Sequence, residues 1–262
     1  LMIRTKYHQN LVMPLNTHGP SLVIGAAIAT VSIFSAAIIF GTDFIDFKQP
    51  MKTQEDLNDI SQQIQEAPEK SQSDAYATSL FTANASPVLG SDDAPITLVE
   101  FGDYQCFYCN RFFHTTEPDI VKNYVETGKV KMIFKDFTII GQDSINAAHG
   151  AHCAEEAGKF WKFHDILYNN WTGENNGWAS PSNISEFAKQ LGLNEEDFKS
   201  CMTEARYVSI IKASYSDAQT LGLTGTPGFF VIGPDNSITK ISGAQPYEVF
   251  EEIFSLELEK IK

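Results

Sequence analysis

The sequence predicts an α/β fold in which a block of helices is inserted into a small sheet. Three observations lead to this class. Apolar runs typical of buried strands occupy residues 96–101 and 130–137, and two more lie within 229–241. Helical patterns fill the interval from about 142 to 221, and an amphipathic helix over 246–261 closes the chain. This order of strands and helices is typical of a mixed α/β domain with a helical insertion.

The remaining elements follow from local patterns taken in chain order. A first strand is expected over 79–83, ahead of a Ser86-Pro87 turn. Pro118 lies inside the helix that follows the strand at 96–101, and it should kink that helix. Residues 144–169 have the pattern of one long helical segment. Three shorter helices should follow at 184–191, 195–204 and 207–221, and the last strands should lie at 229–232 and 238–241.

The chain is organised around Cys106-Phe107-Tyr108-Cys109, which follows the predicted strand and a glycine turn at Gly102. A strand, a turn and a helix in this order bring Cys106 to a helix N-terminus, where backbone N–H groups favour a thiolate. Cys109 lies on the same helical face, within reach of a disulfide. A dithiol redox site needs this arrangement. A zinc half-site and a structural disulfide are the alternatives, but the chain has no second Cys-x-x-Cys.

The N-terminal segment predicts a membrane anchor. Residues 21–40, from Ser21 to Phe40, carry no charged side chain, and twenty helical residues span about 30 Å. Arg4 and Lys6 precede this run, which places residues 1–20 in the cytoplasm and the rest of the chain outside. A cleaved signal peptide is the alternative, although its apolar core is usually about 7–15 residues. Residues 41–77 should form a polar linker that could carry one short helix.

The charge of the chain argues against some partners. The formal net charge is −14 and the isoelectric point is about 4.8. A protein this acidic is not expected to bind nucleic acid or an anionic membrane surface.

Several motifs in residues 78–262 resemble the DsbA/BdbD-type thioredoxin-fold oxidoreductases. They are Val88-Leu89-Gly90, Ala94-Pro95, Val99 to Tyr104 with the two cysteines, Gly158 to Trp161 with His164-Asp165, and Gly222 with Gly225-Thr226-Pro227-Gly228. The resemblance implies a thioredoxin fold that carries an all-helical subdomain at about 142–221.

The resemblance also implies roles for the residues that match. Cys106 would be the attacking thiol and Cys109 the buried resolving thiol. Thr226 would precede a cis peptide bond to Pro227, and its backbone would pair with an extended client as an added strand. An ordinary Thr-Pro turn is the alternative.

Glu100 stands in the middle of an apolar strand, six residues before Cys106. A buried carboxylate is costly unless it has a partner or a task. The resemblance implies that an acid here accepts and returns the proton of Cys109. A solvent-exposed glutamate at a sheet edge is the alternative, and Lys135 on the next strand is a candidate charge partner.

The dipeptide Phe107-Tyr108 departs from the family, where strong oxidants have Pro-His and thioredoxin has Gly-Pro. The missing histidine removes a donor that would stabilise the Cys106 thiolate. We therefore expect a reduction potential between the two limits, roughly −120 to −270 mV.

The other two cysteines are Cys153 and Cys201, and a bond between them resembles a structural bridge found in part of this family. It would join two helices of the insertion and stabilise the fold by about 4 kcal/mol. The alternative is a metal site formed by His149, His152 and Cys153.

Together these expectations describe a membrane-anchored, extracytoplasmic thiol:disulfide oxidoreductase that forms or shuffles disulfides in exported proteins. Its partners would be reduced or misoxidised clients and, as the resemblance implies, a membrane quinone-linked thiol oxidase. No cofactor or metal is expected. A dedicated disulfide reductase and a copper or zinc carrier that uses the reduced thiolates remain alternatives.

Overall fold

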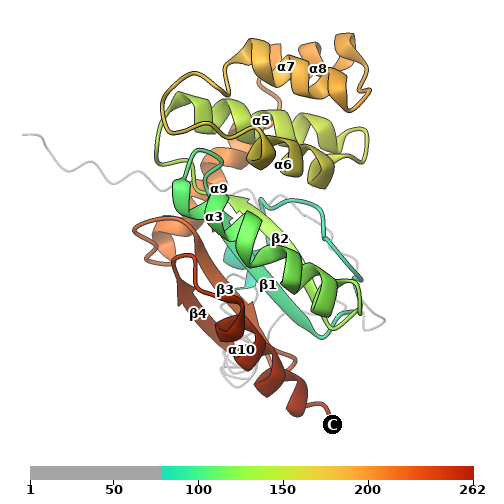
Figure 1. Cartoon of the computed structure of the whole chain (residues 1–262), viewed down its shortest axis with the longest axis vertical. Helices are drawn as coiled ribbons and strands as arrows, with labels where there is room; N and C mark the ends of the chain where they lie inside the picture. Colours follow the sequence, from blue (N-terminus) through green and yellow to red (C-terminus); the bar gives the residue numbers. More distant parts are fainter. Residues whose placement is uncertain (1–77) are drawn as a thin grey trace, which may run out of the picture. The chain divides into compact units, whose positions relative to one another are not determined.

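A four-stranded mixed sheet forms the centre of the computed structural model, which describes residues 78–262 (Figure 1). The strand order is β2-β1-β3-β4. β1 (Ile96–Gly102) pairs in parallel with β2 (Val130–Asp136) and antiparallel with β3 (Gly228–Ile232). β4 (Ile238–Ser242) pairs antiparallel with β3 at the edge. Four of the five predicted strands are confirmed.

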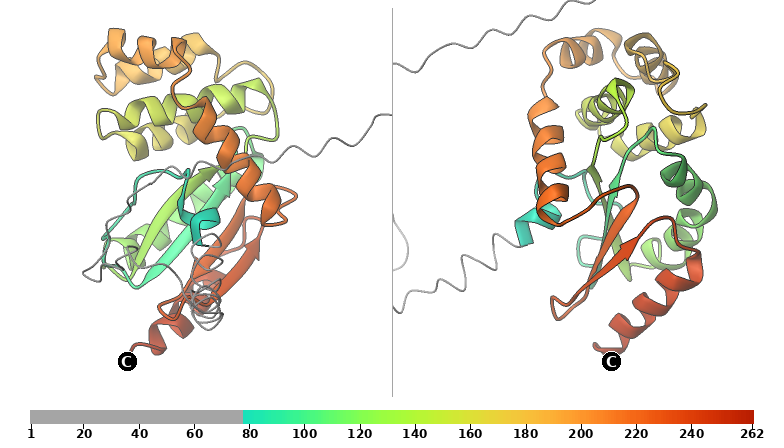
Figure 2. Two further views of the ribbon diagram at one scale, coloured as in Figure 1. Left: turned by 180° about the vertical axis from the view of Figure 1, so that it is seen from behind. Right: turned by 90° about the vertical axis from the view of Figure 1, so that its left-hand side faces the viewer.

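Helices cover both faces of the sheet, which Figure 2 shows edge-on in its right-hand view. One face carries α3 (Phe107–Thr115), α4 (Glu117–Ile120), the π-helix η1 (Val121–Val125) and α10 (Tyr247–Glu259). The other face carries α9 (Val208–Thr220). Side chains alternate between the two faces of β1, so that Ile96 and Leu98 pack with Phe250 of α10, whereas Val99 and Phe101 pack with Ala218 of α9.

The helix after the cysteines breaks where Pro118 requires it. α3 ends at Thr115, Thr116 has a φ of −119° that differs from the usual helical value, and α4 begins at Glu117. Proline is tolerated in the first turn of a helix because its missing N–H has no helical partner there. The predicted kink is therefore confirmed as a break between two helices.

The insertion consists of α5 (Gln142–Glu155), α6 (Phe160–Asn169), α7 (Pro181–Gln190) and α8 (Glu195–Thr203), and it leads into α9. The expectation of one long helix over 144–169 is wrong, because the segment forms two helices. Gly158 separates them in the left-handed region, with φ +66°. Glycine has no Cβ and adopts this conformation at little cost, so it ends helices readily.

The predicted strand at 79–83 is also wrong, since residues 78–82 are helical. Phe81 of this turn packs edge-on against Phe230 of β3, with ring centroids 5.0 Å apart. The segment thus buries its apolar side chain through a helical turn and needs no ladder of backbone hydrogen bonds.

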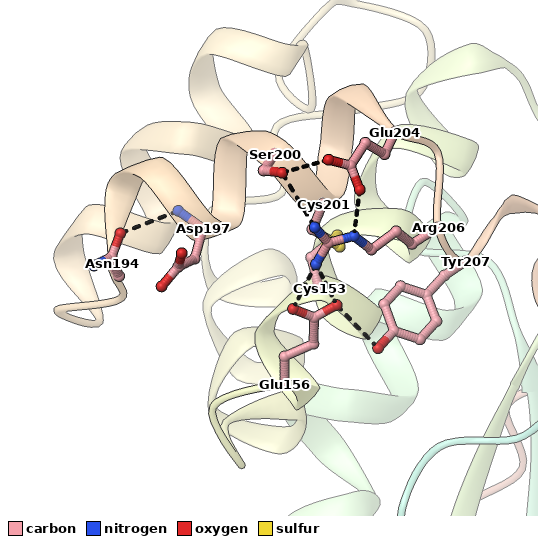
Figure 3. A network of polar contacts seen from close by, with 9 residues as sticks. All are labelled: Cys153, Glu156, Asn194, Asp197, Ser200, Cys201, Glu204, Arg206 and Tyr207. Carbon is pink, nitrogen blue, oxygen red and sulfur yellow. Dashed lines mark hydrogen bonds and ion pairs between the residues drawn. A yellow bond between two sulfur atoms is a disulfide. The ribbon is translucent and has the colours of Figure 1, made fainter.

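The disulfide that the resemblance implies is present between Cys153 of α5 and Cys201 of α8, with Cα atoms 5.9 Å apart (Figure 3). Arg206 links the C-terminal ends of the same two helices at the surface of the insertion. Its guanidinium donates to Glu156 at 3.0 Å and to Glu204 at 2.8 Å.

The metal site expected as an alternative does not form from its three residues. His152 lies 2.7 Å from Asp136 and forms a buried ion pair with it. The cluster of potential ligands is instead His149 with Cys153 and Cys201, whose sulfurs are bonded to each other.

The predicted membrane anchor at 21–40 and the linker at 41–77 lie outside the described residues. Within residues 78–262, no helix is both long enough and apolar enough to cross a membrane.

Candidate active site

Cys106 is the N-cap of α3, directly after the turn that leaves β1. Its backbone N–H donates to the carbonyl of Asp103 at 2.9 Å, which closes this turn. Its Sγ lies 3.3 Å from the carbonyl oxygen of Thr226, on the loop that precedes β3. The residue is 6% exposed, whereas Cys109 is 0% exposed. The structure therefore brings both cysteines and Thr226 together, as the sequence predicts.

The environment of Cys106 favours a thiolate. A hydrogen bond from the Cys109 thiol is the largest influence, and it outweighs burial, so the pKa of Cys106 falls to about 6. Thr226 and the backbone N–H groups of Tyr108 and Cys109 lower the pKa further. Most of the group is thus ionised at pH 7, and the thiolate is the nucleophilic form of cysteine.

Cys109 has the opposite character. Burial, followed by its hydrogen bond to Cys106 and the charges of Cys106 and Glu100, raises the pKa of Cys109 well above its usual range. It therefore remains a thiol when the pair is reduced. One accessible thiolate beside one shielded thiol is the asymmetry that thiol–disulfide exchange needs.

Glu100 lies on the same face of β1 as α3 and is 2% exposed. Burial, then the charges of Glu117 and Cys106, raises the pKa of Glu100 well above its usual range. It is not the solvent-exposed glutamate of the alternative.

Lys135 is not the charge partner of Glu100. The parallel register sets Glu100 opposite Phe134 and sets Lys135 opposite Phe101, so Lys135 faces the other side of the sheet. There its ammonium pairs with Asp217 of α9 at 2.8 Å. A shift of one position along a strand reverses the face, which explains why this proposed pair fails.

Two residues of the active-site turn that the sequence reasoning missed hold the turn in place. The Asp103 carboxylate accepts from the N–H groups of Gln105, Ile139 and Ile140. The Gln105 side chain donates to Ser144 of α5 at 2.9 Å and accepts from the N–H of Asn175 at 2.6 Å. In the sequence, the signal for this role was the presence of polar residues between the end of a buried strand and Cys106.

The dipeptide between the cysteines forms an exposed aromatic rim. Phe107 and Tyr108 are 51% and 52% exposed, and their ring centroids lie 5.4 Å apart. Arg111 lies over the Tyr108 ring at 5.0 Å, and Trp171 lies 6.0 Å from Phe107. The rim offers apolar contact area beside Cys106.

The Thr226–Pro227 peptide bond is cis, the isomer that the sequence analysis expects. The surrounding loop, residues 222–228, lines a pocket of about 200 Å³ together with Lys240, Ser242 and Gly243 of the neighbouring strand region.

Comparison with known proteins identifies the family. The family model described as Thioredoxin matches residues 82–253. The chain belongs to this family. Probable disulfide bond formation protein D of Bacillus cereus is 30% identical over 158 residues, which are 59% of this chain and 73% of that protein.

Disulfide bond formation protein D of Bacillus subtilis is 31% identical over 148 residues, or 55% of this chain and 67% of that protein. The crystal structure of oxidised BdbD from Bacillus subtilis has a TM-score of 0.60 at 28% identity, covering 66% of this chain and 92% of that chain. With the Cys106–Cys109 geometry, these likenesses show a DsbA-like thiol:disulfide oxidoreductase.

Proposed function

We propose that this DsbA-like oxidoreductase forms or shuffles disulfides in exported proteins outside the cytoplasm. One observation carries the proposal. A low-pKa thiolate at Cys106, which is 6% exposed, lies beside a fully buried Cys109 and next to an exposed aromatic rim that offers contact area to unfolded chains. Unfolded clients expose apolar side chains, and the rim of Phe107 and Tyr108 offers them contact area.

In the oxidising direction, a client thiolate attacks Cys106 Sγ and breaks the Cys106–Cys109 bond. Cys109 leaves as a thiolate and takes up a proton from Glu100, whose pKa is raised because burial favours the neutral, protonated form. A second client thiolate then attacks the client sulfur of the mixed disulfide and releases Cys106. Two electrons pass from the client to the protein, whose cysteines end as one thiolate and one thiol.

The Thr226 backbone is proposed to hold the client as an added strand. The carbonyl of Thr226 lies 3.3 Å from Cys106 Sγ, and the pocket of residues 222–228 lies alongside it. Main-chain pairing of this kind gives affinity without a fixed client sequence. It would place a client cysteine next to Cys106.

The copper or zinc carrier receives no support from the described residues. The cluster of three potential metal ligands in residues 78–262 contains His149, Cys153 and Cys201, and neither Cys106 nor Cys109 belongs to it.

The membrane anchor and the recycling partner are parts of the same proposal. The uncharged run from Ser21 to Phe40 supports an anchor, and an anchored domain could be reoxidised by a membrane quinone-linked thiol oxidase. The protein should then remain in the membrane after alkaline carbonate washing, with its domain open to external protease. Quantitative release of a chain that begins after residue 40 would show a cleaved signal instead.

Refolding of model clients tests the activity. The oxidised protein should restore activity to a reduced client and to one with scrambled disulfides. Cys106→Ser should abolish both activities, and Cys109→Ser should accumulate mixed disulfides at Cys106. Failure of the wild-type protein on both clients would refute the proposal.

A further inference from the structure

A cluster of buried polar groups lies on the face of the sheet that carries α3. The hydroxyls of Tyr104 and Tyr168, both ring nitrogens of His164 and Oε2 of Glu117 are buried, and none has a hydrogen-bond partner among the described residues. Buried polar groups are nearly always paired with protein or with ordered water. Several unpaired groups in one place therefore point to a shared task.

Ring contacts show that the cluster is continuous. The His164 ring lies 5.5 Å from Tyr104 and 5.0 Å from Tyr168, and the two tyrosine rings lie 5.1 Å apart. Phe113, Phe134 and Trp161 enclose the imidazole at 5.1 to 5.7 Å. The three polar rings thus lie in contact with one another and are enclosed by aromatic side chains.

The inner end of this cluster meets the redox site, since Tyr104 and Tyr168 pack in the same core cluster as Cys109. The charges of Cys109 and Glu100 are the two strongest electrostatic influences on Tyr168, and with burial they raise its pKa well above its usual range. Glu117 is the strongest charge that acts on Glu100. Glu100, Tyr168 and Glu117 are therefore electrostatic neighbours of Cys109 or of one another.

The outer end opens to solvent through Glu117. This residue is 5% exposed and lines a groove of about 400 Å³ between α4 and α6, whereas its Oε2 is turned into the protein. The break at Thr116 starts α4 at Glu117, and a π-helix follows at once. Single-turn π-helices of this kind are frequent at functional sites.

We propose that Glu117 is a proton-relay residue that reprotonates Glu100 from the groove, through the cluster of Tyr104, His164 and Tyr168. The inference rests on the proposed function, because it supplies the proton that Glu100 gives to Cys109. Glu117 acts through Glu100 and touches neither sulfur in this account. Water that enters the groove bridges the gaps between the polar atoms.

The proton balance closes along such a path. A client dithiol brings two protons and two electrons. As the Cys106–Cys109 bond breaks, Glu100 gives its proton to Cys109 and Glu117 replaces that proton in the same step, so that no anion is left buried at Glu100. A proton from the groove then restores Glu117, while Cys106 remains a thiolate and the client's protons go to solvent. At a pH above the pKa of Cys106, the reduction of one active-site disulfide therefore releases one proton in total.

The charges around Glu117 set the pH at which it works. His164 and Asp165 face it from α6, Glu100 faces it from β1, and His114, Lys122 and Glu126 line the groove. Burial raises the pKa of Glu117 to about 7, against the opposing effect of His164. Glu117 can thus both take and give a proton near neutral pH, as a relay must.

The test compares Glu117→Gln with Glu126→Gln, a matched control on the exposed wall of the groove. The full-length oxidised protein is mixed with rising concentrations of dithiothreitol, and tryptophan fluorescence follows reduction of the Cys106–Cys109 bond. The rate at saturating dithiothreitol is measured from pH 5.5 to 8.5, in H₂O and in D₂O, with and without imidazole buffer.

The wild type and Glu126→Gln should share one pH profile, in which the limiting rate divided by the thiolate fraction of dithiothreitol falls above about pH 7 as Glu117 loses its proton. Glu117→Gln should lower the limiting rate about tenfold or more and abolish this fall. It should also increase the solvent isotope effect, and imidazole should restore the rate in proportion to its concentration. Glu117→Asp keeps a carboxylic acid and should therefore retain the wild-type pH profile. This variant provides the test if Glu117→Gln does not fold.

Wild-type rates and isotope effects in Glu117→Gln would overturn the relay and leave the proposed function intact. A slower Glu117→Gln with no imidazole rescue and no added isotope effect would also overturn it, since a structural defect is not repaired by buffer. A wild-type disulfide that dithiothreitol and client dithiols cannot reduce would overturn both proposals.

Discussion

Replacement of Cys109 by alanine should raise the pKa of Cys106, because the Cys109 thiol donates the hydrogen bond that contributes most to the low value of about 6. A hydrogen bond to a charged group contributes about 1.5–3 kcal/mol. Since one pKa unit corresponds to about 1.4 kcal/mol, the loss amounts to about 1–2 units. The pKa of Cys106 should therefore lie at about 7–8 in Cys109→Ala.

Cys109→Ser is the matched control, because its hydroxyl keeps a donor at the same place while it removes the second thiol. Both variants contain Cys106 as the one free thiol of residues 78–262 beside the Cys153–Cys201 disulfide. Thiolate absorbance at 240 nm and the rate of iodoacetamide alkylation, each followed against pH, report the pKa. Equal pKa values in the alanine and serine variants would refute the assignment of the hydrogen bond.

Three further perturbations test the fold and the site. Burial would lower the pKa of His152, but the Asp136 carboxylate raises it to about 9, so the pair stabilises the fold fully below about pH 6.5 and ceases to do so as the pH rises through 9. In urea titrations, His152→Gln should lower the free energy of unfolding by about 3 kcal/mol at pH 6 and by much less at pH 10. Equal losses of stability at the two pH values would contradict the ion pair. Replacement of Cys153 and Cys201 by serine should cost about 4 kcal/mol of stability by the chain-entropy model and leave client oxidation largely intact, whereas a lost activity in a folded protein would give the bridge a redox role. Glu100→Gln should slow reduction of the active-site disulfide about tenfold or more without loss of stability, because burial already favours the neutral form of this group. An unchanged rate would remove Glu100 from the mechanism.

Local sequence patterns were sufficient to place the core of the active site. A buried strand, a glycine turn and a helical pattern occupy consecutive residues, so the position of Cys106 at the helix N-terminus follows from short-range geometry. The place of Glu100 in the middle of an apolar strand likewise predicts its burial. These features depend on neighbours in the chain and needed no knowledge of tertiary contacts.

Contacts between distant segments were not predictable in the same way. The partner of Lys135 depends on the register between β1 and β2, and a one-residue change in that register reverses the face. Gln105 meets Ser144 and Asn175, which lie 39 and 70 residues further along the chain. Glu117 and His164 come near each other only because α6 packs beside α3 and α4. In the sequence Glu117 has the appearance of an ordinary surface residue, and His164 stands out only as part of a motif of the resemblance.

The reduction potential of the Cys106–Cys109 pair tests the central claim most directly. Equilibration of the full-length protein with glutathione at pH 7, followed by alkylation of free thiols, measures it. The pKa of Cys106 is about 6, whereas the attacking thiol of thioredoxin has a pKa of about 7. At pH 7 this difference stabilises the reduced form by about 1 kcal/mol relative to thioredoxin, which corresponds to about 20 mV. The account therefore predicts a value of roughly −250 mV, above that of thioredoxin and well below that of the strongest oxidants. A value at or below about −270 mV, together with an inability to oxidise clients, would contradict the account and identify a dedicated reductase.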